Sequence, residues 1–222
     1  MYCYPLTIVD NYSRYILRIN GQTDIKTEPT QKAFERLFRE VGMPQAIRSD
    51  NGAPFATTGI HGLGRLNVWW LRLGISHQRI VPGHPQDNGA HERMHRDLKD
   101  HCTHPVRANR RGQQRAFDKF ADMYNHERPH ESLGDKMPAS RWRSSRRAFP
   151  DEIPLPEYKA HWLKRRVSSA GLIRLASKAI FISQALWKDD VALEEIENGI
   201  WNVYFYDTLL GRIDERIGRL SA

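Results

Sequence analysis

The sequence predicts an α/β domain followed by a small β-rich module, on the basis of three observations. Runs of β-forming residues alternate with runs of helical periodicity over residues 1–145. The periodicity then stops in residues 146–156, which contain three prolines. Residues 157–222 hold short β-type runs with tight turns between them, a pattern typical of a small β-barrel. We therefore expect a core at 1–145, a linker at 146–156 and a β-module at 157–222.

The elements of the core are predicted in the order of one mixed sheet with helices. Two β-type runs, at 4–10 and 14–20, indicate a hairpin that turns at Asn11-Tyr12-Ser13. Apolar residues at helical spacing after Pro29 predict a helix that ends at Gly42. The remaining predicted elements are strands at 45–50 and 75–80 and helices at 66–74, from residue 90 onward and at 113–126.

Two tryptophans lie in the apolar helical run of residues 66–74. Because Trp69 and Trp70 share that run, we expect them in the core rather than as platforms for stacking bases. After the linker, the β-type runs are 161–167, 172–175, 179–183, 200–206 and 209–214.

Composition excludes several classes of protein. No apolar run approaches the roughly 20 residues that span a bilayer, and the N-terminus lacks the basic region of a signal peptide. The two cysteines, Cys3 and Cys102, form no CxxC pair, so we expect neither a disulfide framework nor a thiolate zinc site. We expect a cytoplasmic protein without a membrane segment.

Positive charge is concentrated in the first part of the chain. Residues 1–149 contain 24 Lys and Arg against 15 Asp and Glu, whereas residues 150–222 contain 10 against 11. The excess is densest at 107–115 and 140–147. Such a one-sided balance favours polyanionic partners, because neutralised phosphates release counterions. A merely soluble basic surface is the alternative.

Asp50 is the first carboxylate whose context indicates chemistry. It ends a predicted strand and enters a turn that contains Gly52. A carboxylate at a strand end is held firmly yet reaches solvent, which suits a hard cation such as Mg²⁺. The alternative is an Asx-turn, in which Asp50 only binds its own backbone.

Glu92 is the second such carboxylate, near the start of a predicted helix. Arg96 and Lys99 follow it at i+4 and i+7, so the three share one helical face. This face combines a potential metal ligand with cations that suit DNA phosphates. An ordinary Glu–Arg pair, worth about 0.2–0.5 kcal/mol, is the alternative.

Five segments together resemble one family. SDNGAPF (49–55) and PGHPQDNGAHERMHRDLK (82–99) resemble the second and third motifs of the retroviral-type integrase core, and still more those of DDE-class bacterial insertion-sequence transposases. YPLTIVDNYSRY (4–15) is similar to the second-strand hairpin of that family, and YNHERPHESLGDKMPASRW (124–142) to the segment that closes its core. LEEIENGIWNVYFYDTLLGRIDER (193–216) resembles the β-module that follows many of these cores.

The resemblance implies a fold and an activity. The fold is an RNase-H-like mixed sheet with flanking helices, its first strand largely missing, followed by a small SH3-like β-barrel. The activity is metal-dependent DNA cleavage and strand transfer with two Mg²⁺ or Mn²⁺ ions. Asp50 and Glu92 are then the second and third catalytic carboxylates and metal ligands. The implied partners are DNA, both element ends and target, and further copies of the chain or a full-length transposase.

Basic residues in three segments are the candidate DNA contacts, although half of those in the basic runs are expected to be simply solvated. The candidates are Arg96, Lys99, Arg107, Arg110, Arg111, Arg143, Arg146 and Arg147.

The sequence departs from the family pattern at its start. The family carries its first catalytic Asp one strand before the hairpin, and nothing before Tyr2 supplies it. Asp10 instead matches a turn position. We therefore expect impaired catalysis, an N-terminally truncated core and an exposed edge on the sheet. A catalytically inactive DNA-binding remnant, or a regulator of a full-length transposase, is the alternative.

Two further alternatives fit the sequence less well. His91, Glu92 and His95 match the zinc-protease pattern HExxH, but Arg93 is charged and no third ligand follows. A ribonuclease-H-like nuclease has a similar sheet and metal demand. The helix after 82–89 and the appended β-module favour the transposase branch instead.

Overall fold

The computed structural model describes residues 3–50, 52–55, 63–80 and 89–221. Its contacts group the chain into two units. Unit 1 comprises Met1–Met43 and Ile80–Phe149, and unit 2 comprises Pro44–Arg79 and Pro150–Ala222. Asn51 and residues 81–88, which include the start of the motif segment 82–99, lie outside the described residues. The boundaries at 1–145, 146–156 and 157–222 stay a prediction.

Unit 1 opens with the predicted hairpin. Strands β1 (Tyr4–Val9) and β2 (Ile16–Gln22) pair antiparallel, which confirms that prediction. The turn closes with a hydrogen bond of 2.8 Å from Asp10 N to Tyr15 O, and Arg14 takes a left-handed φ of 62°. Among the described strands β1 pairs with β2 alone, so its other edge has no described strand beside it.

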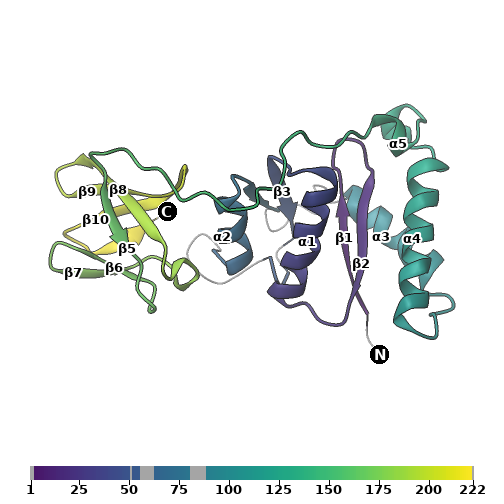
Figure 1. Ribbon diagram of the computed structural model, residues 1–222, viewed down its shortest axis with the longest axis horizontal. Coiled ribbons are helices and arrows are strands. Elements are labelled where there is room, and N and C mark those ends of the chain that lie inside the picture. Colours follow the sequence, from purple (N-terminus) through teal and green to yellow (C-terminus); the bar gives the residue numbers. More distant parts are fainter. Residues whose placement is uncertain (1–2, 51, 56–62, 81–88, 222) are drawn as a thin grey trace. The chain divides into compact units, whose positions relative to one another are not determined.

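Helices flank this hairpin on both sides (Figure 1). They are α1 (Thr27–Val41) on one side and α3 (Gly89–Cys102) and α4 (Arg110–His126) on the other. A buried cluster joins the hairpin to α3 and α4 and includes Ile16, Ile19, Met94, Leu98, Phe117 and Phe120. Helix α4 begins three residues before the predicted start, because the Asn109 side chain caps it by accepting a hydrogen bond of 2.8 Å from Gly112 N.

The segment after α4 returns to the end of α1. It contains the short helices η3 (Glu131–Leu133) and α5 (Pro138–Arg141). Ser145 N then donates to Val41 O at 2.8 Å, and Met43 N donates to Arg147 O at 2.7 Å. Gly42 ends α1 with a φ of 81°, a conformation that glycine adopts without strain.

Unit 2 begins with a parallel pair of strands and the helix between them. Strands β3 (Ala46–Ser49) and β4 (Ser76–Arg79) pair in register, and α2 (Arg65–Arg72) connects them. Trp69 and Trp70 are 6% and 0% exposed, which confirms that both belong to the core.

Most of unit 2 consists of short antiparallel strands. One sheet of five strands has the order β11-β10-β9-β8-β5, and β6 pairs with β7. The bounds are β5 (Leu163–Arg166), β6 (Leu172–Leu175), β7 (Lys178–Phe181), β8 (Asp190–Glu197), β9 (Ile200–Phe205), β10 (Thr208–Asp214) and β11 (Arg219–Ser221), and the short helix η4 (Gln184–Leu186) follows β7. The described strands leave β5 and β11 as edges, so no closed barrel is found.

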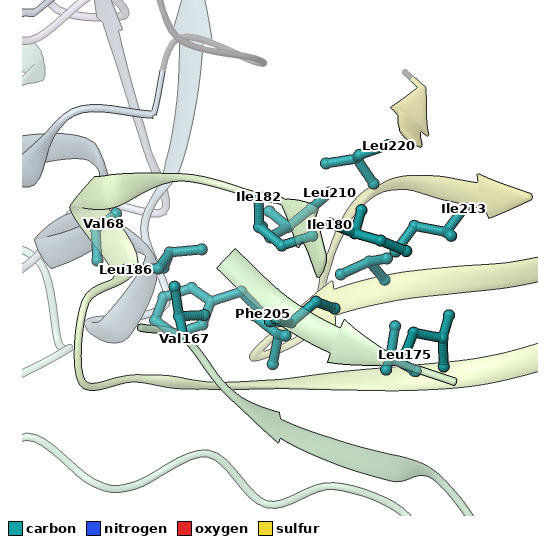
Figure 2. Close-up of a cluster of buried hydrophobic side chains, with 14 residues drawn as sticks. Val68, Val167, Leu175, Ile180, Ile182, Leu186, Phe205, Leu210, Ile213 and Leu220 are labelled. Atoms are coloured by element: carbon teal, nitrogen blue, oxygen red, sulfur yellow. The ribbon is translucent and has the colours of Figure 1, made fainter. Parts of the chain in front are cut away.

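A single apolar cluster fills the interior of these strands (Figure 2). Ile182, Leu186 and Phe205 are fully buried there. Val68 of α2 belongs to the same cluster, beside Leu186 in the close-up. The helix of residues 65–72 and the C-terminal strands therefore share one core.

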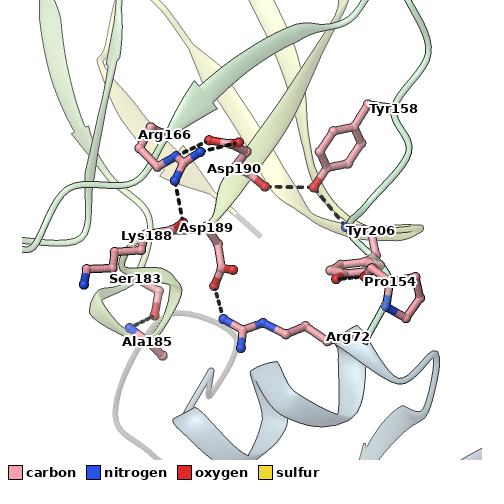
Figure 3. A network of polar contacts seen from close by, with 10 residues as sticks. All are labelled: Arg72, Pro154, Tyr158, Arg166, Ser183, Ala185, Lys188, Asp189, Asp190 and Tyr206. Atoms are coloured by element: carbon pink, nitrogen blue, oxygen red, sulfur yellow. Dashed lines mark hydrogen bonds and ion pairs between the residues drawn. The ribbon is translucent and has the colours of Figure 1, made fainter. Parts of the chain in front are cut away.

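Polar contacts also join α2 and residues 154–158 to the C-terminal strands of unit 2 (Figure 3). Arg72 of α2 forms an ion pair of 2.5 Å with Asp189, which is largely buried. Tyr158 donates to Asp190 O at 2.9 Å and accepts from Tyr206 N, and burial raises its pKa to about 12. Tyr206 in turn donates to Pro154 O at 2.6 Å, so part of the predicted linker is bound to the strands.

No helix in the described part of the chain is long and apolar enough to cross a membrane.

Candidate catalytic and nucleic-acid site

Asp50 lies directly after β3 in unit 2, where its carboxylate is exposed. Its Oδ1 accepts a hydrogen bond of 3.0 Å from Gly52 N. A Cβ added at Gly52 would lie 3.3 Å from the same oxygen, so glycine leaves room for the carboxylate. The hydrogen bond of the alternative, an Asx-turn, is therefore present, and the side chain is also exposed to solvent as a metal ligand would be.

A series of hydrogen bonds orders the backbone at Ser49 and Asp50. His77 Nε2 lies 2.8 Å from Ser49 Oγ, which donates to Asp50 O at 2.9 Å. On the other side of the ring, Asn67 Nδ2 lies 2.7 Å from His77 Nδ1. Burial, with a smaller contribution from Arg79, lowers the pKa of His77 to about 4. His77 is thus neutral at pH 7, with Nδ1 accepting from Asn67 and Nε2–H donating to Ser49.

Glu92 lies in the first turn of α3 in unit 1, with its side chain exposed. A carboxylate there interacts favourably with the helix dipole. Arg96 and Lys99 are also exposed, and Met94 and Leu98 are buried on a different face. The three exposed side chains therefore share one face of α3, as predicted. Among the described residues Glu92 has no ion pair with Arg96, which was the alternative reading of this spacing.

The two histidines of the HExxH pattern contact a strand. His91 Nε2 and His95 Nε2 lie 3.0 and 2.7 Å from Thr7 Oγ1 on β1. Within the described ranges no three His, Cys, Asp or Glu side chains form a group that could hold a metal ion. The contacts instead fix the first turns of α3 against β1.

Asp10 lies at the turn position predicted for it. Its Oδ2 accepts from both the backbone N and the hydroxyl of Ser13. These bonds make it a turn-forming residue of the hairpin.

The predicted DNA contacts differ in exposure. Arg96, Lys99, Arg107, Arg110, Arg111, Arg143 and Arg146 are exposed, whereas Arg147 is half-buried. Arg143 donates to two nearby backbone oxygens, those of Ser140 and Trp142.

The carboxylates also differ in location: Asp50 belongs to unit 2 and Glu92 to unit 1. Each is an exposed carboxylate at the end of an ordered element, and carboxylate oxygens are donors that suit Mg²⁺ or Mn²⁺.

Two family models match the chain, and both are described as integrase core domain. One matches residues 1–85 and the other residues 73–138, so together they include β1, Asp50 and Glu92. Over these residues the chain belongs to the integrase core family.

Curated relatives of this integrase core include an insertion-element protein and a viral polyprotein. The "Insertion element IS476 uncharacterized 39.2 kDa protein" of Xanthomonas euvesicatoria is 30% identical over 137 residues, 60% of this chain and 37% of that protein. The Gag-Pol polyprotein of baboon endogenous virus (strain M7) is 31% identical over 102 residues, 46% of this chain and 6% of that protein. The integrase core described here thus spans well under half of each relative.

A solved structure shares the fold. A chain of the simian T-cell lymphotropic virus intasome in complex with PP2A regulatory subunit B56 gamma aligns with a TM-score of 0.50 and 16% identity. The alignment covers 93% of this chain and 76% of that chain. The RNase-H-like α/β fold class is confirmed for the integrase core, whereas a closed SH3-like barrel is not. The described strands of this core pair as an antiparallel hairpin, β1-β2, and a separate parallel pair, β3-β4, rather than as one hydrogen-bonded mixed sheet.

The integrase core also contains basic residues that the sequence did not single out. Arg14, Arg93, Arg128 and His130 line one cavity of unit 1. They come from the hairpin turn, α3 and the segment after α4. No linear basic run indicates this group, because Arg14, Arg93 and the pair Arg128 and His130 lie tens of residues apart in the sequence.

Proposed function

We propose that this chain acts on DNA as the core of a transposase or integrase, cleaving a strand and transferring its 3′ end to a target. The observation that carries the proposal is the pair of motif carboxylates, Asp50 and Glu92, each exposed at the end of an ordered element in a chain of the integrase core family. DNA cleavage and strand transfer are both in-line displacements at phosphorus.

Asp50 and Glu92 would hold Mg²⁺ or Mn²⁺. A bound divalent cation supplies charge stabilisation to the attacking and leaving oxygens of such a displacement. Hydrogen bonds position the segments that carry these carboxylates. Ser49 and His77 order the backbone of Asp50, and Thr7 contacts the helix turns that carry Glu92.

Arg96 and Lys99 would bind DNA phosphates along the helix that carries Glu92. Both are exposed in α3, so both can reach a DNA backbone. The other candidate contacts, at 107–111 and 143–147, add charge in the same unit.

DNA ends and target DNA are the proposed substrates, and further copies of the chain or a full-length transposase are the proposed protein partners. One neighbour of known structure is a chain of a viral intasome, and the proposed assembly is taken from that likeness.

The second candidate function is DNA binding without cleavage, as a remnant or regulator of a full-length transposase. Asp10 favours it, because its Oδ2 is engaged by the backbone N and the hydroxyl of Ser13 in the hairpin turn rather than directed to a metal site. A metal pair held by Asp50 and Glu92 without a third carboxylate would be bound weakly, and cleavage at such a site would be impaired.

Nicking and strand transfer with Mn²⁺ test the proposal. We expect Asp50→Asn and Glu92→Gln each to lower the rate by about 100-fold or more, roughly 2.7 kcal/mol of transition-state stabilisation. Glu152→Gln, which changes an exposed carboxylate in the proline-containing segment, is the matched control and should retain the rate.

The outcomes separate the two candidates. Cleavage that both variants lose supports the transposase core. DNA binding by the unsubstituted chain without any cleavage supports the remnant. Cleavage that survives in both variants would contradict the assignment of Asp50 and Glu92.

A further inference from the structure

A cavity of unit 1 collects positive charge from three separate elements. Its volume is about 310 Å³, and Arg14, Arg93 and Arg128 line it together with His130. Arg14 lies between β1 and β2, Arg93 lies on α3, and the other two follow α4. The walls therefore converge from distant parts of the sequence within one unit.

A second, more open cavity adjoins the first. Its volume is about 820 Å³, and it shares Arg14 and Ser132 with the smaller one. Arg141 also lines it. Asp10 lines the larger cavity as well, with its Oδ2 bonded to Ser13, so the arginine-lined smaller cavity is the more favourable of the two for a phosphate.

Two of the arginines that line the smaller cavity, Arg14 and Arg93, are not neutralised by its acidic residues. Asp97 forms an ion pair of 2.5 Å with Arg128, and both side chains are about two-thirds buried or more. Glu131 is exposed. Arg14 donates to the neutral Asn11 Oδ1 at 3.1 Å, and among the described residues neither Arg14 nor Arg93 has an ion pair.

His130 adds a polar atom that needs a partner. Its Nε2 is buried and has no hydrogen bond within the described part of the chain. Burial, Arg128, Arg14 and Arg93 lower the pKa of His130, while Asp97 opposes them. The neutral ring can donate from Nε2–H, and leaving a buried polar atom unsatisfied is costly.

We propose that this cavity binds a phosphate of the DNA backbone, with Arg14 and Arg93 as charged donors and His130 Nε2–H as the third donor. Guanidinium groups match phosphate oxygens in a forked geometry, and their attraction is stronger in a cavity than on an open surface. The inference rests on the proposed function, which supplies DNA as the ligand. The cavity is nevertheless a separate site, because its residues are not among the DNA contacts predicted from the basic runs. Free inorganic phosphate shares the same chemistry.

Fluorescence anisotropy with a short labelled duplex tests the site on the full chain. The double variant Arg14→Gln/Arg93→Gln should weaken binding by about tenfold or more. It should also lower the slope of log affinity against log salt by about 0.9 for each phosphate that the variant no longer neutralises. Arg36→Gln, an exposed arginine on α1 that lines neither cavity, is the matched control.

A second variant keeps the arginines in place. Ser132→Glu puts a negative charge on the wall that both cavities share, and it should weaken binding without removing a cation. Circular dichroism of each variant checks that the fold is retained.

Titration with inorganic phosphate, followed by NMR of the His130 ring, distinguishes the source of the phosphate. Duplex binding that both variants weaken far more than Arg36→Gln supports the inference. Duplex binding that the double variant leaves at the level of Arg36→Gln overturns it, as does a His130 response to phosphate that is accompanied by no weakening of duplex binding. Failure of the unsubstituted chain to bind duplex DNA at all would instead contradict the proposed function.

Discussion

At the scale of single residues, His77 shows how a polar chain fixes a candidate catalytic loop. Asn67 supplies a donor to Nδ1 at 2.7 Å, and Ser49 Oγ lies 2.8 Å from Nε2. Only the neutral tautomer with its proton on Nε2 satisfies both contacts, because a protonated ring would direct an N–H at the Asn67 amide. The local geometry before Asp50 therefore depends on a neutral imidazole.

This dependence predicts a pH effect on stability. The pKa of His77 is about 4 in the folded chain, below the ordinary 6.5, chiefly because of burial. Its contribution is therefore fully present above pH 6.5 and is lost as the pH falls from 6.5 toward 4. Because the ring is only half-buried, we expect a loss of about 1–2 kcal/mol in the free energy of unfolding.

Urea unfolding of the unsubstituted chain and of His77→Gln, at pH 7 and pH 5, measures this effect. His77→Gln should be less stable at pH 7 and should lose less between the two pH values. His161→Gln changes an exposed histidine and is the control. Equal pH dependence in all three proteins would contradict the role given to His77.

Residue-level prediction from sequence was good where context is local. The burial of Trp69 and Trp70 and the turn role of Asp10 both follow from neighbouring residues. The cavity around Arg14, Arg93 and His130 could not be predicted, because only the packing of α3 and α4 on the hairpin brings these residues together.

At the scale of secondary structure, periodicity predicted most helices and strands but not the elements that depend on tertiary pairing. The hairpin and α1 follow the expected ranges closely. Strand β8 was not among the predicted runs, because its second half is rich in glutamate, which is disfavoured in strands. Pairing with β5 and β9 on its two sides overrides that preference.

Thr7 of β1 contacts two histidines of α3, so we expect its substitution to loosen the first turns of that helix. Thr7→Val keeps the β-branched shape but removes the oxygen that His91 and His95 contact. We expect faster amide hydrogen exchange in the first turns of α3 and a loss of about 1–2 kcal/mol in stability. In the activity assay the rate should fall as well, because Glu92 lies in those turns.

Hydrogen exchange read by mass spectrometry resolves this segment. Thr208→Val changes an exposed threonine of β10 and should leave the exchange of α3 unchanged. Exchange in α3 that is the same in Thr7→Val as in the unsubstituted chain would show that the histidine contacts do not stabilise the helix.

At the scale of the whole chain, each unit is built from two separated segments. Residues 44–79 group with 150–222 rather than with their sequence neighbours. Composition and turn signals could not predict this grouping, because they report only on adjacent residues. The decisive contacts are Val68 in the apolar cluster and the ion pair of Arg72 with Asp189.

The shared core predicts that a change in α2 destabilises the C-terminal strands. Val68 is 2% exposed, and Val68→Ala removes two methyl groups from the cluster that contains Leu186. Lost burial and the remaining cavity should together cost roughly 2 kcal/mol. Amides of β8 and β9 should then exchange faster, although both strands are more than a hundred residues from the substitution. Val106→Ala, at a position that is 70% exposed, provides the matched comparison. If β8 and β9 exchange equally in both variants, packing of Val68 does not stabilise the C-terminal strands. The grouping of residues 44–79 with 150–222 would then make no measurable contribution to stability.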